Sequence, residues 1–378
     1  MKINIQEVIT LEHGGDIYTE GLFKEKKLID FSSNINPLGV PKGFKDHIEE
    51  ALISVERYPD IQYRKLKGYI AEYIKFSKDY FENGLKDIET AASKSYENNI
   101  VLGNGAAELI DLCISCFKSV SLTVPSFIEY EKSALKWDCD IKYSFLTKNL
   151  EYDYDDIYLK LMETEALVIG NPNNPNGLVI DKTKFKKIMD YCQNNNKKII
   201  IDEAFIEFTG KRGFSFLKEA ESYSCVFIIK ALTKFYAMPG VRLGYGICAD
   251  KEMIRSMEGK QNPWNINCFA EIAAKYSLED KEYIEKSLQW IELERKFITE
   301  ELKGLSFIKA IYNTYSNFVL CKLKKLDCDN LYNLCLNRGI VIRKCDNFVG
   351  LDKNYVRFAI KDRERNELLI EILKSLKI

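Results

Sequence analysis

Residues 226–244 are VFIIKALTKFYAMPGVRLG, and this stretch decides the fold. Its first four residues are apolar, mostly β-branched or aromatic, as expected of a strand buried on both faces. Lys234 follows this run, and Arg242 lies between two glycines shortly afterwards. A single lysine is more commonly a solvated surface group. A lysine among apolar groups and near cations has a depressed pKa, which Schiff-base chemistry requires, and Arg242 can hold a phosphate in forked geometry.

The same kind of short apolar run recurs along the chain and alternates with helical patterns. This alternation predicts an α/β fold with helices on both faces of a mostly parallel sheet. Shorter strands return after a long helical pattern at 282–302 and predict a small α+β domain, closed by a helix over 363–376 that Asp362 caps. The expected strands are 100–102, 122–124, 166–169, 198–201, 226–229, 317–321, 340–342 and 355–360, and two further expected helices are 106–117 and 182–193.

This organisation divides the chain into three parts. Residues 1–36 are predicted to form an arm that packs with the small domain. Residues 37–275 form the large, ligand-binding domain, and residues 276–378 form the small domain. At 378 residues the chain is too long for one compact core, which agrees with this division.

Composition excludes several classes of partner. The net charge of −1 implies no basic face, so we expect neither nucleic-acid nor membrane binding. The N-terminus lacks the apolar core of a signal peptide, and eleven scattered cysteines favour reduced thiols, so we expect a cytoplasmic protein. Cys113 and Cys116 form a lone C-x-x-C in an apolar helical pattern, which indicates core packing, and no metal site is expected.

Two loops that follow predicted strands have unusual compositions. Residues 103–108 (GNGAAE) open a helix, where small residues and free backbone N–H groups favour an anion, although such glycines often serve only a tight turn. Residues 171–177 (NPNNPNG) could be a rigid surface turn, but their number exceeds what a turn needs. They can hold an Asn side chain over a ligand.

Three charged residues lie at strand ends. Asp202 ends the run 198–201, where a carboxylate is costly unless it meets a cation such as a protonated pyridine nitrogen; capping a helix is the simpler alternative. Arg343 and Arg357 belong to short strands of the small domain. They could be exposed partners of acids such as Asp346, or they could bind two anionic groups of one substrate.

Taken together, these motifs resemble the fold-type-I pyridoxal-phosphate enzymes of the aspartate aminotransferase superfamily, from about Asp30 to the C-terminus. Two groups in that superfamily compete: histidinol-phosphate aminotransferases and threonine-phosphate decarboxylases of cobalamin biosynthesis. Residues 13–16 (HGGD), 30–39 (DFSSNINPLG) and 233–240 (TKFYAMPG) resemble the decarboxylases. The aminotransferases tend to open with an Asn-Glu-Asn-Pro type of segment and lack the His-Gly-Gly element.

The resemblance implies a role for each motif residue. Lys234 would carry pyridoxal 5'-phosphate as a Schiff base, and Asp202 would pair with the pyridine nitrogen. Asn174 would bond the ring hydroxyl, and Phe127 would stack on the ring face. The implied phosphate ligands are Gly105, Ala106 and Arg242, and Thr233 is a further implied cofactor contact. Tyr58 would reach in from the second subunit of a homodimer. The implied substrate contacts are Arg357 with the carboxylate, Arg343 and His13 with the phosphate, and Asn34 and Asn36 on the segment that lines the pocket.

The chain departs from the aminotransferase pattern at two positions. Phe205 stands where aminotransferases usually have a tyrosine that bonds the cofactor hydroxyl, as in the decarboxylases. Ala231 stands three residues before the lysine, where the family normally has a phosphate-binding serine or threonine. One phosphate hydrogen bond is therefore expected to be missing, unless Thr233 replaces it.

We therefore expect decarboxylation of a small phosphorylated amino acid: threonine phosphate to aminopropanol phosphate, or phosphoserine to ethanolamine phosphate. The alternative is an aminotransferase acting on histidinol phosphate or another amino acid. A catalytically silent protein that only binds a partner is a third possibility. The intact set Asn174, Asp202, Lys234, Arg242 and Arg357 argues against the silent protein.

Overall fold

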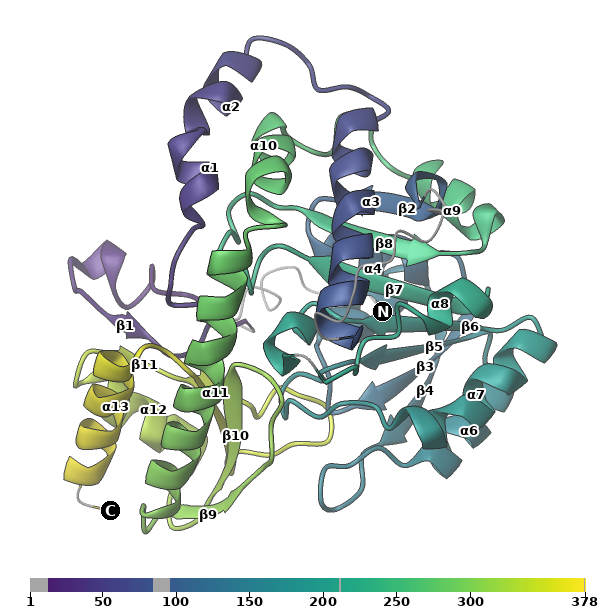
Figure 1. The fold of residues 1–378 in the computed structure, drawn as a ribbon. Helices are drawn as coiled ribbons and strands as arrows, with labels where there is room; N and C mark the ends of the chain where they lie inside the picture. Colours follow the sequence, from purple (N-terminus) through teal and green to yellow (C-terminus); the bar gives the residue numbers. More distant parts are fainter. Residues whose placement is uncertain (1–12, 84–95, 211, 377) are drawn as a thin grey trace.

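The computed structural model describes residues 13–83, 96–210, 212–376 and 378, so the first twelve residues of the predicted arm lie outside the described residues. A seven-stranded sheet with the order β2-β8-β7-β6-β5-β3-β4 is the centre of the large domain (Figure 1). Only β8 is antiparallel to its neighbours, which confirms the predicted mostly parallel α/β sheet. The strands are β2 (Ile100–Gly103), β3 (Ser119–Val124), β4 (Asp140–Phe145), β5 (Ala166–Gly170), β6 (Lys198–Asp202), β7 (Val226–Ala231) and β8 (Gly244–Cys248).

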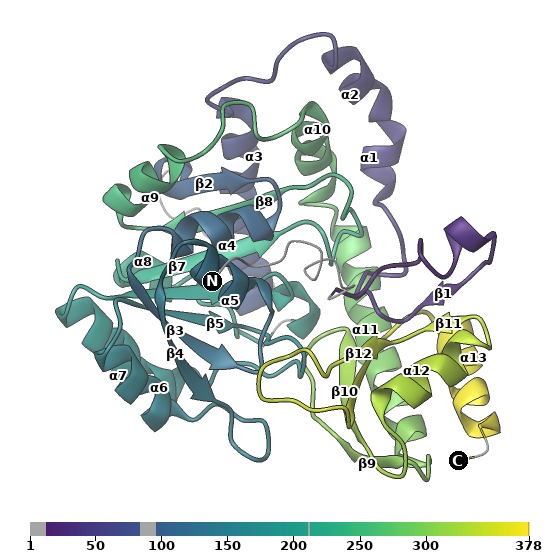
Figure 2. The ribbon, with the colours of Figure 1, turned by 180° about the vertical axis from the view of Figure 1, so that it is seen from behind.

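Helices cover both faces of this sheet. Figures 1 and 2, taken from opposite sides, show α3 and α7 in front of one face and α4 and α5 in front of the other. On β6, Ile199 and Ile201 belong to one hydrophobic cluster and Ile200 to the other, which explains why the strand is apolar throughout. The helices of this domain are α1 (Lys42–Asp46), α2 (Ile48–Ser54), α3 (Arg64–Lys78), α4 (Ala106–Ile114), α5 (Glu129–Lys136), α6 (Tyr154–Met162), α7 (Lys182–Asn194), α8 (Glu219–Ser222), α9 (Lys251–Glu258) and α10 (Cys268–Ser277).

The small domain is an antiparallel sheet with the strand order β12-β13-β10-β9, packed against helices. The long helix α11 (Lys281–Lys303) runs from the large domain into it (Figure 1). Asp362 caps the last helix through the backbone N–H of Arg365, as predicted. The strands are β9 (Ile308–Ile311), β10 (Phe318–Leu323), β12 (Arg343–Lys344) and β13 (Tyr355–Ala359), and the remaining helices are α12 (Cys328–Leu336) and α13 (Arg363–Ser375).

The N-terminal segment runs beside the small domain. Its strand β1 (Ile29–Asp30) pairs in parallel with β11 (Ile340–Val341). The backbone N–H of Ala359 then donates to the carbonyl of Phe31, which ties the segment to β13 as well. The residues that follow β1 are therefore delivered to the edge where the two domains meet.

Four strands escaped the sequence prediction: β1, which is only two residues long, and β4, β8 and β9. β4 is an edge strand with mixed polar residues, and β8 contains two glycines, which are uncommon inside strands. β9 is only four residues long. The helix expected over 106–117 ends at Ile114, and the strand expected over 340–342 divides into β11 and β12. Within the described residues, every helix is too short or too polar to cross a membrane.

Candidate active site

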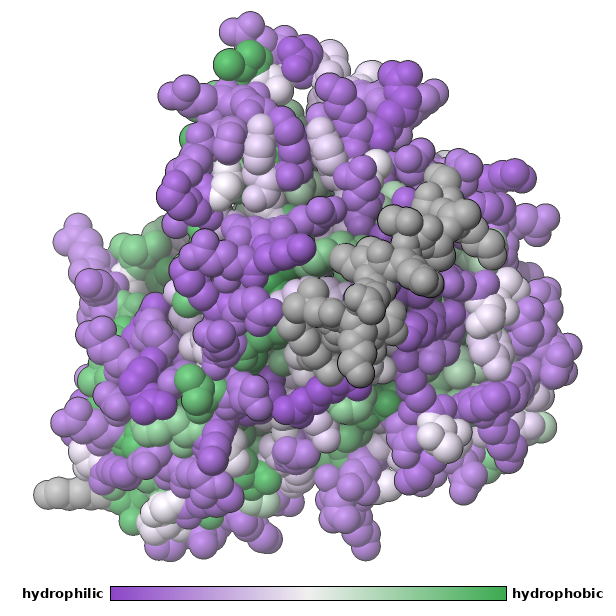
Figure 3. Space-filling view, in the orientation of Figure 1, coloured by the Kyte–Doolittle hydropathy of each residue, from purple (hydrophilic) through white to green (hydrophobic). Residues whose placement is uncertain are grey.

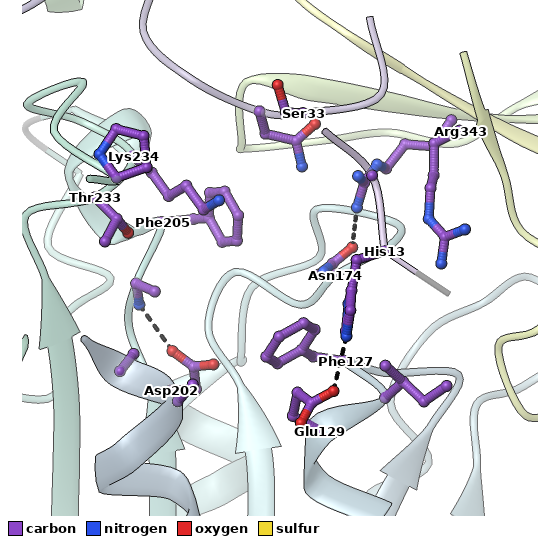
Figure 4. Close-up of a pocket in the computed structure, with 18 of the residues that line it drawn as sticks. His13, Ser33, Phe127, Glu129, Asn174, Asp202, Phe205, Thr233, Lys234 and Arg343 are labelled. Atoms are coloured by element: carbon purple, nitrogen blue, oxygen red, sulfur yellow. Dashed lines mark hydrogen bonds and ion pairs between the residues drawn. The ribbon is translucent and has the colours of Figure 1, made fainter. Parts of the chain in front are cut away.

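A cavity of about 460 Å³ lies where the carboxyl ends of β5, β6 and β7 face the small domain and the N-terminal segment. Open α/β sheets bind their ligands at this edge. Three separate parts of the chain contribute to its wall: Asp202 and Lys234 from the large domain, Arg343 and Arg357 from the small domain, and His13 from the N-terminal segment (Figure 4).

Lys234 lies in the loop after β7, with its side chain directed into the cavity. Burial, together with the positive charges of Arg357 and Arg242, lowers the pKa of its ammonium group from 10.5 to about 8. About one amine in ten is therefore neutral at pH 7, the form that attacks a carbonyl carbon.

Asp202, at the end of β6, is fixed by two hydrogen bonds. Its Oδ2 accepts from the hydroxyl of Tyr130 at 2.7 Å, and its Oδ1 accepts from the backbone N–H of Ala204 at 3.0 Å. Burial raises the pKa of this carboxyl group, while the bond from Tyr130 opposes the change. A cationic ligand would favour the ionised form. No α-helix starts at Asp202, because a short 3-10 turn at Ile206–Thr209 follows it.

Glycines let a guanidinium approach the start of α4. A Cβ on Gly105 would lie 2.4 Å from Nη2 of Arg242, and one on Gly244 would lie 2.6 Å from the carbonyl carbon of Gly105. Gly105 also has a φ of 79°, which side-chain-bearing residues rarely adopt. Arg242 donates to the carbonyl of Asn104 at 3.0 Å. The first N–H groups of α4 and this guanidinium together form a cradle for an anion.

Arg357 crosses the cavity from β13 and is held at two points. Its Nη1 donates to Oδ1 of Asn174, and its Nη2 donates to the carbonyl of Ser32 at 2.9 Å. Within the described part of the chain, its Nε is buried without a hydrogen-bond partner. Burial lowers the pKa of the guanidinium to about 10, and the charge of Arg343 contributes to this shift.

Arg343 lies directly opposite Arg357 in the register of β12 and β13. Only 7% of Arg343 is exposed, so the alternative of a surface ion pair does not apply. Its Nη2 donates to Oδ1 of Asn347 at 2.8 Å, and its guanidinium lies 5.1 Å from the centre of the Phe348 ring. Two like charges on opposite residues repel each other, so an anion between them would be stabilising.

His13 lies at the mouth of the cavity. Its Nε2 is 2.8 Å from Oε1 of Glu129, and its ring centre is 6.0 Å from that of Phe127 (Figure 4). Asn34 also lines the cavity, and its Oδ1 is buried with no hydrogen-bond partner among the described residues. An acceptor left in this state marks a place where a ligand can donate.

Most residues singled out from the sequence meet at this cavity, and three do not line it. Gly105 lies directly behind the wall that Ala106 forms. The side chain of Asn36 faces away: its amide donates to the carbonyl of Phe235 and to Oγ of Ser287, both at 2.8 Å. Tyr58 is 77% exposed and packs on Trp264, with ring centres 4.7 Å apart. The residues that line it are His13, Asn34, Ala106, Phe127, Asn174, Asp202, Thr233, Lys234, Arg242, Arg343 and Arg357.

Three polar residues of the site were missed by the sequence analysis. Tyr130 lies in the first turn of α5, three residues after Phe127. That spacing from a predicted site residue was the signal by which Tyr130 could have been assigned to the site. Glu129 and Lys361 had no such signal. Lys361 is 6% exposed and donates to the carbonyl of Ser33 at 2.9 Å; burial lowers its pKa to about 8.

Comparisons with known proteins agree with this arrangement. The family described as aminotransferase class I and II matches residues 26–373. A Caldanaerobacter subterraneus protein provisionally named threonine-phosphate decarboxylase is 37% identical, over 97% of this chain and 94% of its own. The threonine-phosphate decarboxylase of Salmonella typhimurium is 30% identical over 96% of each chain. A crystal structure of histidinol-phosphate aminotransferase from Clostridium acetobutylicum is 48% identical, with a TM-score of 0.84, and the match covers 92% of this chain and 98% of that one.

Proposed function

The chain belongs to the aminotransferase class I and II family of pyridoxal-phosphate enzymes, and from this premise we propose that it decarboxylates a phosphorylated amino acid. The preferred substrate is threonine phosphate, which would yield aminopropanol phosphate, a precursor in cobalamin biosynthesis. Phosphoserine, which would yield ethanolamine phosphate, is the second candidate. In either case the bond from Cα to the carboxyl carbon breaks, carbon dioxide leaves, and a proton is added at Cα.

The residues present fit pyridoxal phosphate. Lys234 supplies an amine with a lowered pKa, and the carboxyl group of Asp202, whose pKa burial raises, can pair with a cation. The cradle of Gly105 and Arg242, which a Cβ would fill, suits the cofactor phosphate. Phe127 offers a flat apolar face beside the cavity.

The observation that carries the substrate assignment is the pair Arg343 and Arg357. Both guanidinium groups are buried, they lie opposite each other on neighbouring strands, and both line the cavity. A substrate with two anionic groups would neutralise both. Threonine phosphate has two anionic groups, a carboxylate and a phosphate. Histidinol phosphate has one anionic group, its phosphate, and an imidazole.

The mechanism assigns each of these residues a task. When bound, pyridoxal phosphate supplies an electron sink for a bond broken at Cα. Arg357, held by Asn174 and Ser32, would bind the carboxylate and keep it in one orientation. Arg343 and His13 would hold the phosphate. Lys234 Nζ would then deliver a proton to Cα after carbon dioxide leaves.

An aminotransferase acting on histidinol phosphate is the second candidate function. The 48% identity to the Clostridium acetobutylicum structure favours it. The same pocket would serve if Lys234 removed the proton from the carbon that bears the substrate amine, although histidinol phosphate has no carboxylate for Arg357 to bind. Phe205 lacks the hydroxyl that the resemblance assigns to aminotransferases, and this favours the decarboxylase.

The proposed functional unit is a homodimer in which Tyr58 reaches the partner's cofactor phosphate. Large apolar side chains are exposed around it: Leu52, Ile53, Val55, Ile61 and Trp264. Figure 3 shows one small hydrophobic area over α2, at the top of the molecule, within a mainly hydrophilic surface. Exposed apolar side chains that cluster in one region are typical of a contact surface. An active species with the mass of one chain in light scattering would contradict the dimer.

The decisive experiment uses Arg343→Ala. Holoenzyme is incubated with threonine phosphate, and release of carbon dioxide is compared with keto-acid formation in the presence of 2-oxoglutarate. The variant should bind threonine phosphate about 10- to 150-fold more weakly, since a charge-assisted hydrogen bond contributes roughly 1.5–3 kcal/mol. Arg338→Ala, an exposed arginine that bonds Ser375, is the control. Equal loss for threonine and threonine phosphate would contradict the assignment.

A further inference from the structure

Residues 13–16, here called the His13 segment, are seated closely on the turn that follows β1. The backbone N–H of Gly15 donates to Oγ of Ser32 at 2.7 Å. A Cβ on Gly14 would lie only 2.2 Å from the carbonyl oxygen of Ser32. Even a methyl group at residue 14 would therefore push His13 away from its present position.

The turn beneath this segment is itself held by charged residues. Asp30 accepts from the N–H of Ser32 at 2.7 Å, from its hydroxyl at 2.6 Å and from the N–H of Ser33 at 3.1 Å. Lys361 donates to the carbonyl of Ser33. The backbone that presents His13 to the cavity is therefore fixed from below.

Glu129 fixes the imidazole of His13 from the other side. This carboxylate stands in the first turn of α5, 28% exposed, and its Oε1 is 2.8 Å from Nε2 of His13. The same oxygen is 3.6 Å from Nζ of Lys132. The hydrogen bond with His13 lowers the pKa of Glu129, so this carboxyl group is ionised at neutral pH. Since Nε2 is occupied, Nδ1 is the nitrogen that can meet a substrate.

We propose that Glu129 is a positioning residue for the substrate phosphate: its carboxylate accepts from Nε2–H of His13 and orients the ring, so that an imidazole with a proton on each nitrogen can donate Nδ1–H to a phosphate oxygen. This inference rests on the proposed function. A neutral imidazole has one N–H, and Glu129 would take it, which would leave Nδ1 as an acceptor facing an anion. A protonated imidazole donates from both nitrogens.

Several cations lie near His13, and Glu129 is the carboxylate that balances them at the imidazole. Arg343 and Arg357 face it from the small domain and Lys132 from α5, and each disfavours a further positive charge. Asp16 lies on the His13 segment itself, where its carboxylate is turned to the N–H groups of Tyr18 and Thr19. Glu129 is the acid in direct contact.

The test measures two quantities on holoenzyme. The first is the dissociation constant of threonine phosphate, with threonine as the reference ligand. The second is the titration of the imidazole resonances by NMR. The chain has only two histidines. His47 stacks on Tyr276 and bonds the carbonyl of Gly43, so it provides an internal reference.

Glu129→Gln keeps the shape and a hydrogen-bond acceptor but removes the charge. It should weaken threonine phosphate binding about 10-fold at pH 7.5, leave threonine binding unchanged and shift the imidazole resonances of His13 relative to those of His47. Gly14→Ala removes no polar group and should weaken threonine phosphate binding to a similar extent. Glu131→Gln, on the same helix and bonded to Tyr143, is the matched control and should change neither quantity.

The outcomes distinguish the role of Glu129 from the proposed function of the protein. If Glu129→Gln leaves the imidazole resonances of His13 and the affinity unchanged while Arg343→Ala still loses affinity, Glu129 has no positioning role and the proposed function stands. If the unaltered protein binds threonine and threonine phosphate equally well, the proposed function falls, and the role of Glu129 falls with it. A Glu129→Gln variant that raises the dissociation constant of threonine phosphate and also shifts the His13 resonances supports the proposal.

Discussion

The two halves of the cavity differ in how they are built. In the cofactor half, Asp202, Lys234 and Arg242 all lie at one edge of one sheet, at the end of β6 or in the loop between β7 and β8. In the substrate half, His13 comes from the N-terminal segment, and Arg343 and Arg357 come from the small domain. The residues proposed to carry out the chemistry therefore belong to the large domain, and those proposed to select the substrate belong to the small domain and the N-terminal segment. Substitutions in the cofactor half should slow turnover of every substrate alike. Substitutions in the substrate half should change the relative affinity for different substrates and the ratio of products.

The largest effect is expected for Lys234→Ala. Loss of the amine should abolish the visible absorbance of the lysine-bound cofactor and lower turnover by about 10⁴-fold or more, for every substrate, because proton transfer at Cα is lost as well. Absorbance spectra and carbon dioxide release measure the two effects. A lysine adduct that borohydride still traps in the variant would mean that another lysine carries the cofactor.

Asp202→Asn should slow turnover about 10²- to 10³-fold, again without regard to substrate. The amide keeps the shape but cannot stabilise a positive charge on the ring nitrogen. Tyr130→Phe, which removes one hydrogen bond to the same carboxylate, should cost about 2- to 10-fold. Both are measured as kcat with saturating cofactor. Near-normal turnover of Asp202→Asn would show that this carboxylate is only structural.

Arg357→Ala tests the substrate half. It should weaken substrate binding about 10- to 150-fold and should also change the ratio of decarboxylation to transamination, because the carboxylate becomes free to rotate. Carbon dioxide and keto acid are measured in parallel. A change in affinity with an unaltered product ratio would mean that Arg357 binds the carboxylate without orienting it.

The smallest effect connects the two halves. Lys234 has a pKa of about 8, so the amine of apoprotein is neutral in about one molecule in ten at pH 7. The rate of cofactor capture should rise with pH and level off above about pH 8. Removing the charge of Arg357 favours the ammonium form, so Arg357→Ala should shift this profile upward by a fraction of a unit. Stopped-flow absorbance measures the rate. If the variant had the same pH profile as the unaltered protein, the charge of Arg357 would have no effect on the ionisation of Lys234.

The cofactor half could be predicted from the sequence to a large extent. Asp202 and Lys234 each follow an apolar run that the structure shows as a buried strand, and parallel strands bring their carboxyl ends to one edge. Local sequence and sheet topology were sufficient there.

The substrate half could be predicted only in part. The small-domain strands were expected, but nothing in the sequence places Arg343 opposite Arg357, because a register is a tertiary property. Glu129 and His13 are paired across the cavity, although they are distant in the chain. The side chain of Asn36 faces away from the cavity because the loop of Phe235 offers it a carbonyl. Backbone partners of this kind leave no sequence signal.

β8 lies between β2 and β7 in the sheet, although it follows both in the chain. The anion cradle combines the turn after β2 with Arg242, which directly precedes β8. The cradle therefore forms only when β2 pairs with β8, which brings Ile100 opposite Ile247. Because such distant pairings form slowly, a refolding chain should recover its helical circular dichroism first and its cofactor absorbance later. The cofactor would then report when folding is complete.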